Sequence, residues 1–246
     1  MSAISPKLIA FCICFFCGIA TTSFAQEAKS DSTASVKKTK KKKDKSPGDS
    51  TKKKIKLFKD DEPLQMSVST DVRALLGEKK RDVYQKATVT LRLPDSSDVS
   101  EVIDIRTRGN FRRDFCYFPS MMLNFAAVEG NRLASLEKMK IVCTCKQGSD
   151  FEQLVLKEYL TYKIYNELTD TSFRVRMAKI TFLDTDKKRK PFSYYGFMIE
   201  DVDDMAKRND CREIELKNLH TELTDRKYMT MVALFQYMIG NTDWSV

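Results

Sequence analysis

One stretch of the sequence decides the expected fold, and it reads Arg106-Thr107-Arg108-Gly109-Asn110-Phe111-Arg112-Arg113-Asp114. A strand is expected to run into this stretch, because apolar residues alternate with polar ones from Val102 onwards. It then enters a turn at Gly109-Asn110, two residues that tolerate a positive φ. Four arginines surround the turn, and backbone N–H groups and guanidinium groups both bind oxyanions, so the stretch predicts a phosphate-binding corner. The alternative is a solvated basic turn between two strands.

Short segments on both sides of this turn have the residue pattern of strands. They are rich in β-branched residues or alternate apolar with polar residues, and Gly, Pro, Asp and Ser separate them. The expected strands are 63–70, 85–93, 99–108, 118–125, 138–145, 173–183 and 192–199. The pattern of the first four predicts a largely antiparallel sheet.

Two segments have the pattern of helices. Ser149-Asp150-Phe151-Glu152 has the spacing of a capping box and opens a helix that ends near Leu168. Its apolar positions are expected to pack on the sheet; they are Leu156, Leu160, Ile164 and Leu168, widened by Phe151, Val155 and Tyr159. The second helix is expected at 226–239. A sheet interrupted by one helix and followed by helical chain is an α+β pattern.

The turn Arg108-Gly109-Asn110 resembles the signature of the CotH-like kinases, and more particularly a version found in secreted proteins of the Bacteroidetes type. Three further segments, 138–142, 195–202 and 239–244, are similar to the family's motifs and follow their order. The resemblance covers residues 62–246. It implies an atypical protein-kinase-like fold, in which an antiparallel-sheet amino-terminal lobe precedes the start of a helical carboxy-terminal lobe.

The same resemblance implies a nucleotide site that uses ATP and Mg²⁺. Arg108, Gly109 and Asn110 would cradle the phosphates, and the segment from Glu200 to Val202 would form the hinge that meets the adenine. The expected reaction is phosphoryl transfer to a hydroxyl group of a protein or envelope component. Without the family resemblance, the residues themselves do not identify a nucleotide or an acceptor.

Asp243 matches the family's catalytic aspartate, where a carboxylate could orient or deprotonate the acceptor hydroxyl. A polar turn that ends a helix is the alternative interpretation. Asn124 stands where the family often has a lysine, and Lys140 or Lys146 could replace it. The sequence ends three positions after Asp243, so the family's downstream metal-binding aspartate has no counterpart and the metal ligands are unknown. The resemblance therefore predicts a carboxy-terminally truncated domain with impaired or no activity.

Residues 1–25 are expected to form a signal peptide. Lys7 precedes the apolar run 8–19, and Ser23-Phe24-Ala25 places small residues where a signal peptidase reads them. An uncleaved signal anchor is the alternative. No later segment is long and apolar enough for a transmembrane helix, so we expect an exported protein in the periplasm, at the cell envelope or outside the cell.

Residues 26–60 are expected to form a disordered linker before a folded domain at 61–246. Between Lys37 and Lys59 there are twelve lysines and two aspartates, so this segment accounts for the whole formal net charge of +9. The linker could contact an anionic surface or serve as a spacer. From Lys37 to Lys54 no aromatic residue interleaves with the lysines, and nucleic acid is therefore not expected as a partner.

Four cysteines follow the expected signal peptide, namely Cys116, Cys143, Cys145 and Cys211. Disulfides are possible in an exported protein. Cys143 and Cys145 are too close in a strand to pair easily with each other, whereas pairing with Cys116 or Cys211 stays open. The chain has one histidine, His220, which argues against a multi-histidine metal site.

Two classes of function follow from these patterns. The first is an exported CotH-like kinase, incomplete in this chain. The second is a non-catalytic, envelope-associated binding or structural protein on the same scaffold. Dependence on nucleotide and magnesium distinguishes them.

Overall fold

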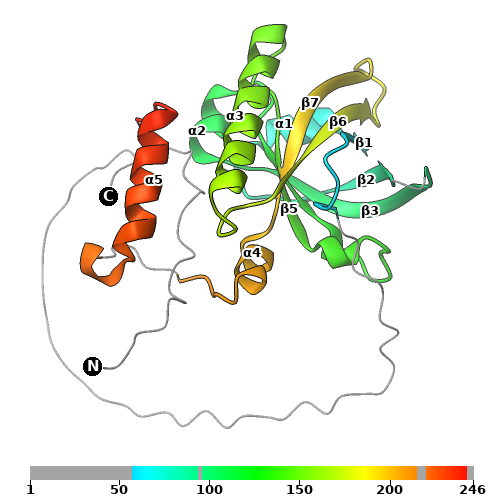
Figure 1. Ribbon diagram of the computed structural model, residues 1–246. Coiled ribbons are helices and arrows are strands. Elements are labelled where there is room, and N and C mark those ends of the chain that lie inside the picture. The colour runs from blue at the N-terminus through cyan, green and yellow to red at the C-terminus, as the bar shows by residue number, and fades with distance from the viewer. Residues whose placement is uncertain (1–56, 94–95, 215–219, 243–246) are drawn as a thin grey trace, which may run out of the picture. The chain divides into compact units, whose positions relative to one another are not determined.

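The computed structural model describes residues 57–93, 96–214 and 220–242 (Figure 1). The expected signal peptide, nearly all of the expected linker and Asp243 lie outside these residues. The elements, in chain order, are β1 (Leu64–Thr70), α1 (Val72–Gly77), β2 (Gln85–Arg92), β3 (Asp98–Thr107), α2 (Asn110–Phe115), β4 (Met121–Asn124), η1 (Phe125–Ala127), η2 (Ala134–Leu136), β5 (Lys138–Val142), α3 (Ser149–Leu168), β6 (Val175–Asp184), β7 (Phe192–Ile199), α4 (Val202–Arg208), η3 (Thr221–Leu223) and α5 (Arg226–Met238).

The positions of the expected strands and helices are confirmed. Each of the seven expected strand segments contains one strand, and the helix expected from Ser149 to Leu168 has those bounds. Strand β4 is shorter than expected because it begins only at Met121, and β5 is shorter because the chain leaves the sheet after Val142. The expected capping box does not form, because Gly148 is the N-cap of α3 and no side chain caps the helix; Glu152 instead accepts from the backbone N–H of Tyr195 at 2.6 Å. Local residue patterns thus locate the elements.

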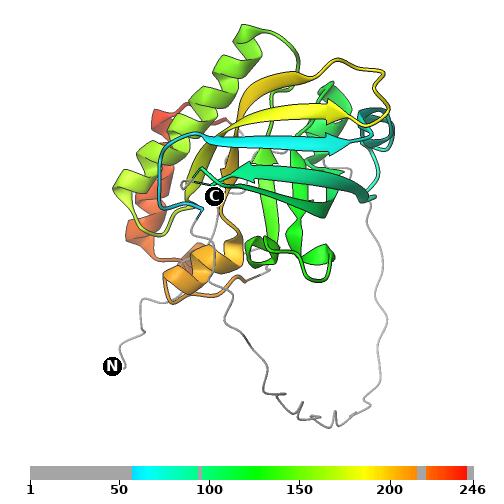
Figure 2. The same cartoon turned by 90° about the vertical axis from the view of Figure 1, so that its right-hand side faces the viewer.

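The sheet is a closed barrel in the order β1-β2-β3-β4-β5-β7-β6. The pair β1 and β6 is parallel, and the other neighbouring strands are antiparallel. In Figure 2, β1 lies between β2 and β6 and points in the same direction as β6. The expected two-lobed, atypical protein-kinase-like α+β fold is therefore wrong: the described chain forms a seven-stranded mixed barrel with a few helices.

The closure depends on a pairing between segments that are far apart in the sequence. The pairs between β1 and β6 run from Leu64 with Ala178 to Thr70 with Asp184. An open lobe would leave hydrogen-bonding groups of both strands exposed, whereas the closed barrel pairs them. No local residue pattern in either segment indicates that the two strands pair with each other. The sequence therefore predicted the strands but not the closure of the barrel.

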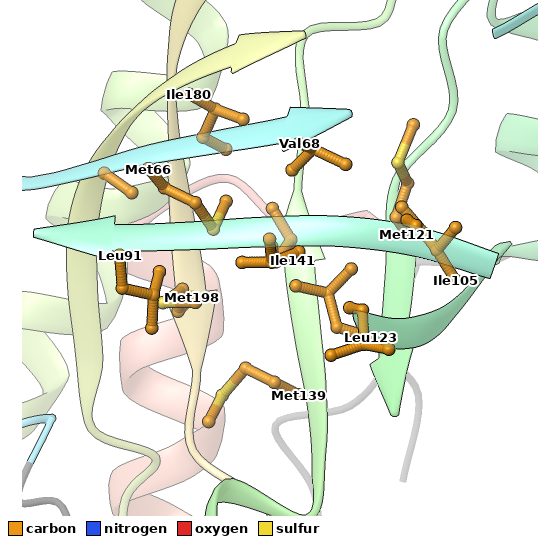
Figure 3. Packing of buried hydrophobic residues seen from close by; sticks show 14 of the residues in the cluster. Met66, Val68, Leu91, Ile105, Met121, Leu123, Met139, Ile141, Ile180 and Met198 are labelled. Atoms are coloured by element: carbon orange, nitrogen blue, oxygen red, sulfur yellow. The ribbon is translucent and has the colours of Figure 1, made fainter. Parts of the chain in front are cut away.

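The main hydrophobic core fills the barrel (Figure 3). In β1, the residues Leu64, Met66, Val68 and Thr70 point inward at every second position. Facing strands contribute the other inward side chains, among them Leu91, Ile105, Leu123, Ile141, Ile180 and Met198. Alternation with a period of two puts one apolar row of each strand inside, so the interior is packed with side chains.

Helix α3 covers the outer surface of β5, β6 and β7. Val155 is buried there, and the rings of Tyr159 and Tyr162 each lie 5.7 Å from the ring of Phe197. The expected packing face was partly wrong, because the side chains of Leu160, Ile164 and Leu168 are exposed. The helix turns its tyrosine face to the sheet, since aromatic rings there fill the space beside Phe197.

The two ends of the barrel are distinguished by the strands that finish there. We call the end where β1, β3, β5 and β6 finish the Thr107 rim, and the end where β2, β4 and β7 finish the Ile199 rim. At the Ile199 rim, the buried Arg176 donates to the carbonyl oxygens of Leu57 (2.8 Å) and Glu62 (3.1 Å). The segment before β1 is thereby held at this rim. Helix α5 packs on α3 through Phe235, whose ring lies 4.7 Å from that of Tyr165.

Candidate functional site

The turn expected to bind phosphate lies at the Thr107 rim, between β3 and α2. Gly109 has a φ of +88° and directly precedes α2, as a glycine at a tight turn allows. The backbone N–H of Arg108 donates to the carbonyl oxygen of Ser120 at 2.8 Å, which joins the turn to the start of β4. Asn110 is the first residue of α2.

Arg112 is engaged by the protein itself. Its guanidinium group forms an ion pair with Glu158 of α3 at 2.7 Å, and both side chains are largely removed from water. It also donates to the hydroxyl of Ser120 and to the carbonyl oxygen of Cys143, each at 3.3 Å. Arg112 thus ties α2 to the barrel and to α3.

Arg106 and Arg113 converge on one carboxylate. Both donate to Asp82, in the connection between α1 and β2, and Arg113 also donates to the carbonyl oxygen of Thr107 at 2.9 Å. The hydrogen bond from Arg113 and the charges of Arg106 and Arg113 lower the pKa of Asp82 below its ordinary value of 3.8. Together with Arg112, these residues account for three of the four arginines around the turn, and each binds a carboxylate of the protein.

The expected hinge lies elsewhere, at the Ile199 rim. The carboxylate of Glu200 is buried and accepts from Arg208 at 2.8 Å and from the backbone N–H of Arg174 at 3.0 Å. Val202 is the first residue of α4, which Asp201 caps by accepting from the N–H of Asp203. In this position, the side chain of Glu200 anchors α4 to the chain before β6.

The structure separates the two halves of the expected nucleotide site. Strands β3 and β7 run in opposite directions, so Arg108 to Asn110 follow one rim and Glu200 to Val202 follow the other. Helices α2 and α4, which begin at these segments, lie apart in both views (Figures 1 and 2). Asn124 also ends its strand at the Ile199 rim. Asp243 lies outside the described residues, and its catalytic role stays a prediction.

A pocket that the sequence did not predict lies at the Thr107 rim. Its volume is about 340 Å³, and its lining residues are Tyr117, Phe118, Thr144, Lys146, Gln147, Arg189, Lys190, Pro191 and Phe192. They come from the connections before β4, before α3 and before β7, and from Phe192, the first residue of β7. Three of them are basic and none is acidic. The pocket is therefore cationic by composition.

An aromatic cluster supports one side of this pocket. The ring of Phe118 makes edge contacts with Phe182, Phe192 and Tyr194, at centroid distances of 4.7, 5.3 and 5.7 Å. Burial raises the pKa of Tyr194 well above its ordinary value, so its hydroxyl stays neutral. The cluster belongs to the packed end of the barrel interior, which makes this side of the pocket rigid.

One disulfide bond and one backbone hydrogen bond hold two walls of the pocket together. The disulfide Cys116–Cys145 joins the residue before Tyr117 to the residue before Lys146. The backbone N–H of Phe118 donates to the carbonyl oxygen of Cys145 at 3.1 Å. This pairing is among those that the sequence left open. It fixes the spacing between two walls that come from different connections.

The cations of the pocket are positioned by aromatic rings. Lys146 Nζ lies 4.5 Å from the centroid of the Phe115 ring, and the guanidinium carbon of Arg189 lies 5.7 Å from that of Tyr117. Arg189 also donates to the Tyr117 hydroxyl. Within residues 57–93, 96–214 and 220–242, none of Lys146, Arg189 and Lys190 forms an ion pair with a carboxylate. Their charges are thus available to a ligand.

The sequence contained only part of the signal for this pocket. Lys146 was a candidate to replace the family lysine at whose position Asn124 stands, whereas the basic run Lys187 to Lys190 falls between the expected strands 173–183 and 192–199. The described residues contain no group of three or more His, Cys, Asp or Glu side chains that could hold a metal ion. No helix in the described ranges is long and apolar enough to cross a membrane.

Comparisons with protein-family models, with curated proteins and with solved structures find no match to this chain. The resemblance to the CotH-like kinases therefore stays a prediction from its motifs. The closed barrel overturns the fold that this resemblance implied.

Proposed function

We propose that this chain is an exported, non-catalytic binding protein, and that the pocket at the Thr107 rim binds an anionic group. One observation carries the proposal: three basic residues and no acidic residue line a pocket of about 340 Å³. That volume falls within the range of roughly 300 to 1,000 Å³ that is typical of small-molecule sites. The disulfide Cys116–Cys145 is consistent with export.

The ligand chemistry follows from the donors. The planar guanidinium group of Arg189 can give two parallel hydrogen bonds to a phosphate or carboxylate, while Lys146 and Lys190 act as point charges. Thr144 and Gln147 add polar side chains to the lining. A ligand with a phosphate or carboxylate group and a compact body fits this set, and its affinity should fall as salt concentration rises.

The test is calorimetric titration of the full chain with inorganic phosphate and, separately, with Mg-ATP. Because a hydrogen bond to a charged group contributes about 1.5 to 3 kcal/mol, Arg189→Gln should weaken phosphate binding roughly 10-fold to 100-fold. Lys138→Gln is the matched control, since Lys138 is an exposed cation at the Ile199 rim, and it should leave the affinity unchanged.

Three results would contradict the proposal. They are no phosphate binding by the unaltered chain, equal losses in Arg189→Gln and Lys138→Gln, and transfer of phosphate from Mg-ATP to an acceptor. The last result would instead support the phosphoryl-transfer reaction that the family resemblance implied.

A further inference from the structure

Helix α2 presents an exposed pair of aromatic rings beside the pocket. Phe111 and Phe115 are 58% and 54% exposed, and their rings stack with centroids 5.3 Å apart. An exposed apolar pair is unusual on a monomeric surface when it adjoins other exposed aromatic groups, and here Tyr117 adds a third ring that is 48% exposed.

The exposure of these rings does not result from a loose helix. Arg112 links α2 to Glu158 of α3 at 2.7 Å, and Arg113 links it to the carbonyl oxygen of Thr107 at 2.9 Å. The disulfide of Cys116, the residue after α2, adds a covalent link at the C-terminal end of the helix. Arg112, Arg113 and Cys116 thus fasten α2 to its neighbours, while the side chains of Phe111 and Phe115 stay exposed.

The aromatic pair is continuous with the cationic pocket. Lys146 Nζ lies 4.5 Å from the centroid of the Phe115 ring, and the same side chain lines the pocket. Tyr117 and Arg189, which contact each other, line the same pocket as Lys146. We call the surface made by Phe111, Phe115, Tyr117, Lys146, Arg189 and Lys190 the aromatic–basic face.

An anionic bilayer satisfies both parts of this face. Aromatic side chains partition into the boundary between headgroups and acyl chains, and lysine and arginine attract anionic headgroups. A small soluble anion would use the cations alone and would leave Phe111 and Phe115 in water. The face therefore fits a phosphate group that is presented at an apolar surface.

Two of the nearby carboxylates are neutralised by lysines outside the face, and Asp184 accepts the backbone N–H groups of Lys188 and Arg189. Asp114 of α2 is paired with Lys80 at 2.9 Å, and Asp186 is paired with Lys188 at 2.7 Å. Asp150, which is exposed in the first turn of α3 and follows Gln147 by three positions, opposes an anionic surface. Its removal should strengthen binding.

We infer that the aromatic–basic face docks on an anionic lipid bilayer, with a lipid phosphate in the pocket and the rings of Phe111 and Phe115 at the headgroup boundary. This inference rests on the proposed function, because it names the source of the anionic group.

The experiment is flotation of the full chain with vesicles of phosphatidylcholine, with and without phosphatidylglycerol. Binding should require phosphatidylglycerol. Lys146→Gln with Lys190→Gln should weaken it by about fivefold for each cation, which corresponds to roughly 1 kcal/mol per lysine near an anionic surface. Phe111→Ser with Phe115→Ser should weaken it by at least about tenfold through lost apolar burial, and Asp150→Asn should strengthen it.

Matched controls separate the lipid source from the anion itself. Tyr237→Ser removes an aromatic ring that is 88% exposed on α5 and should leave flotation unchanged. Glycerol phosphate in solution should bind the Phe111→Ser variant, which keeps the Phe115 ring beside Lys146, as tightly as the unaltered chain. Urea denaturation of the double phenylalanine variant checks that it is folded.

The outcomes distinguish the two proposals. If glycerol phosphate binds but vesicles do not, the bilayer inference is overturned and the pocket proposal stands. If neither binds, both are overturned. Equal flotation of the double phenylalanine variant and the unaltered chain would also overturn the bilayer inference. Binding to soluble polyglutamate as tight as the binding to vesicles would overturn it as well.

Discussion

Replacement of Gly196 by alanine should destabilise the barrel through one backbone clash. Gly196 lies in β7, where its neighbour Phe197 pairs with Val142 of β5 and where Gly196 itself pairs with Ala178 of β6. A Cβ atom at this position would lie 2.5 Å from the carbonyl oxygen of Val142 and 2.8 Å from Cδ1 of Ile180. The isoleucine could rotate, but the carbonyl oxygen belongs to a paired strand, so β5 or β7 would have to move.

The expected magnitude follows from opposing contributions. Overpacking of a core costs about 1 to 3 kcal/mol, and a clash with backbone belongs at the upper end. Alanine restricts the unfolded chain more than glycine does, which offsets about 0.4 to 1 kcal/mol. The free energy of unfolding should therefore fall by about 2 kcal/mol, and Tm should fall by roughly 4 to 8 °C for a domain of this size.

Gly77 provides the matched control. It is the last residue of α1, and a Cβ atom there would meet nothing within 4 Å. Gly77→Ala should be neutral or should stabilise the protein by up to about 1 kcal/mol. Urea denaturation with the disulfide intact measures both variants. A free energy of unfolding for Gly196→Ala within about 0.5 kcal/mol of the unaltered protein would refute the steric argument.

Two further predictions concern titratable groups. Burial raises the pKa of the Cys143 thiol to about 12. Because the thiolate is the reactive form, alkylation at pH 8 should label Cys143 only after denaturation. Labelling of Cys143 in the folded protein as fast as that of the partly exposed Cys211 would contradict this. Since Arg113 and Arg106 lower the pKa of Asp82 below 3.8, the ionised form stabilises the fold above that pH and loses its effect as pH falls through the lowered value. Asp82→Asn should therefore be less stable than the unaltered protein at pH 7, with a difference that shrinks only below pH 3.8; an equal difference at pH 7 and at pH 2, measured by urea denaturation, would count against the pairing.

The candidate site shows where residue patterns stop being informative. The turn at Gly109 was predicted with its positive φ, because glycine tolerance is a local property. The partners of the surrounding arginines were not predicted, since Asp82 and Glu158 come from other parts of the chain. The residue pattern alone does not distinguish an arginine that pairs with a distant carboxylate of the protein from one that can bind a phosphate ligand.

The pocket at the Thr107 rim was also not predicted from the sequence, because its lining residues come from separate connections. Its cations belong to the connection before α3 and to the turn between β6 and β7, and each of these segments alone has the composition of a solvated turn. The disulfide between Cys116 and Cys145 and the barrel closure bring them to one surface. Only that proximity distinguishes one cationic pocket from separate basic loops.

The sequence by itself determined the strands, the long helix and the glycine turn, because alternation, helical periodicity and φ preference act between residues close together in the chain. The tertiary structure alone decided that β6 pairs with β1. It also decided that Arg106, Arg112 and Arg113 bind carboxylates of the protein, whereas the three cations that line the pocket do not. The physical reason is that hydrogen bonds and ion pairs depend on distance in space. Strands β1 and β6 are more than 100 residues apart in the chain, and they come within hydrogen-bonding distance only when the barrel closes.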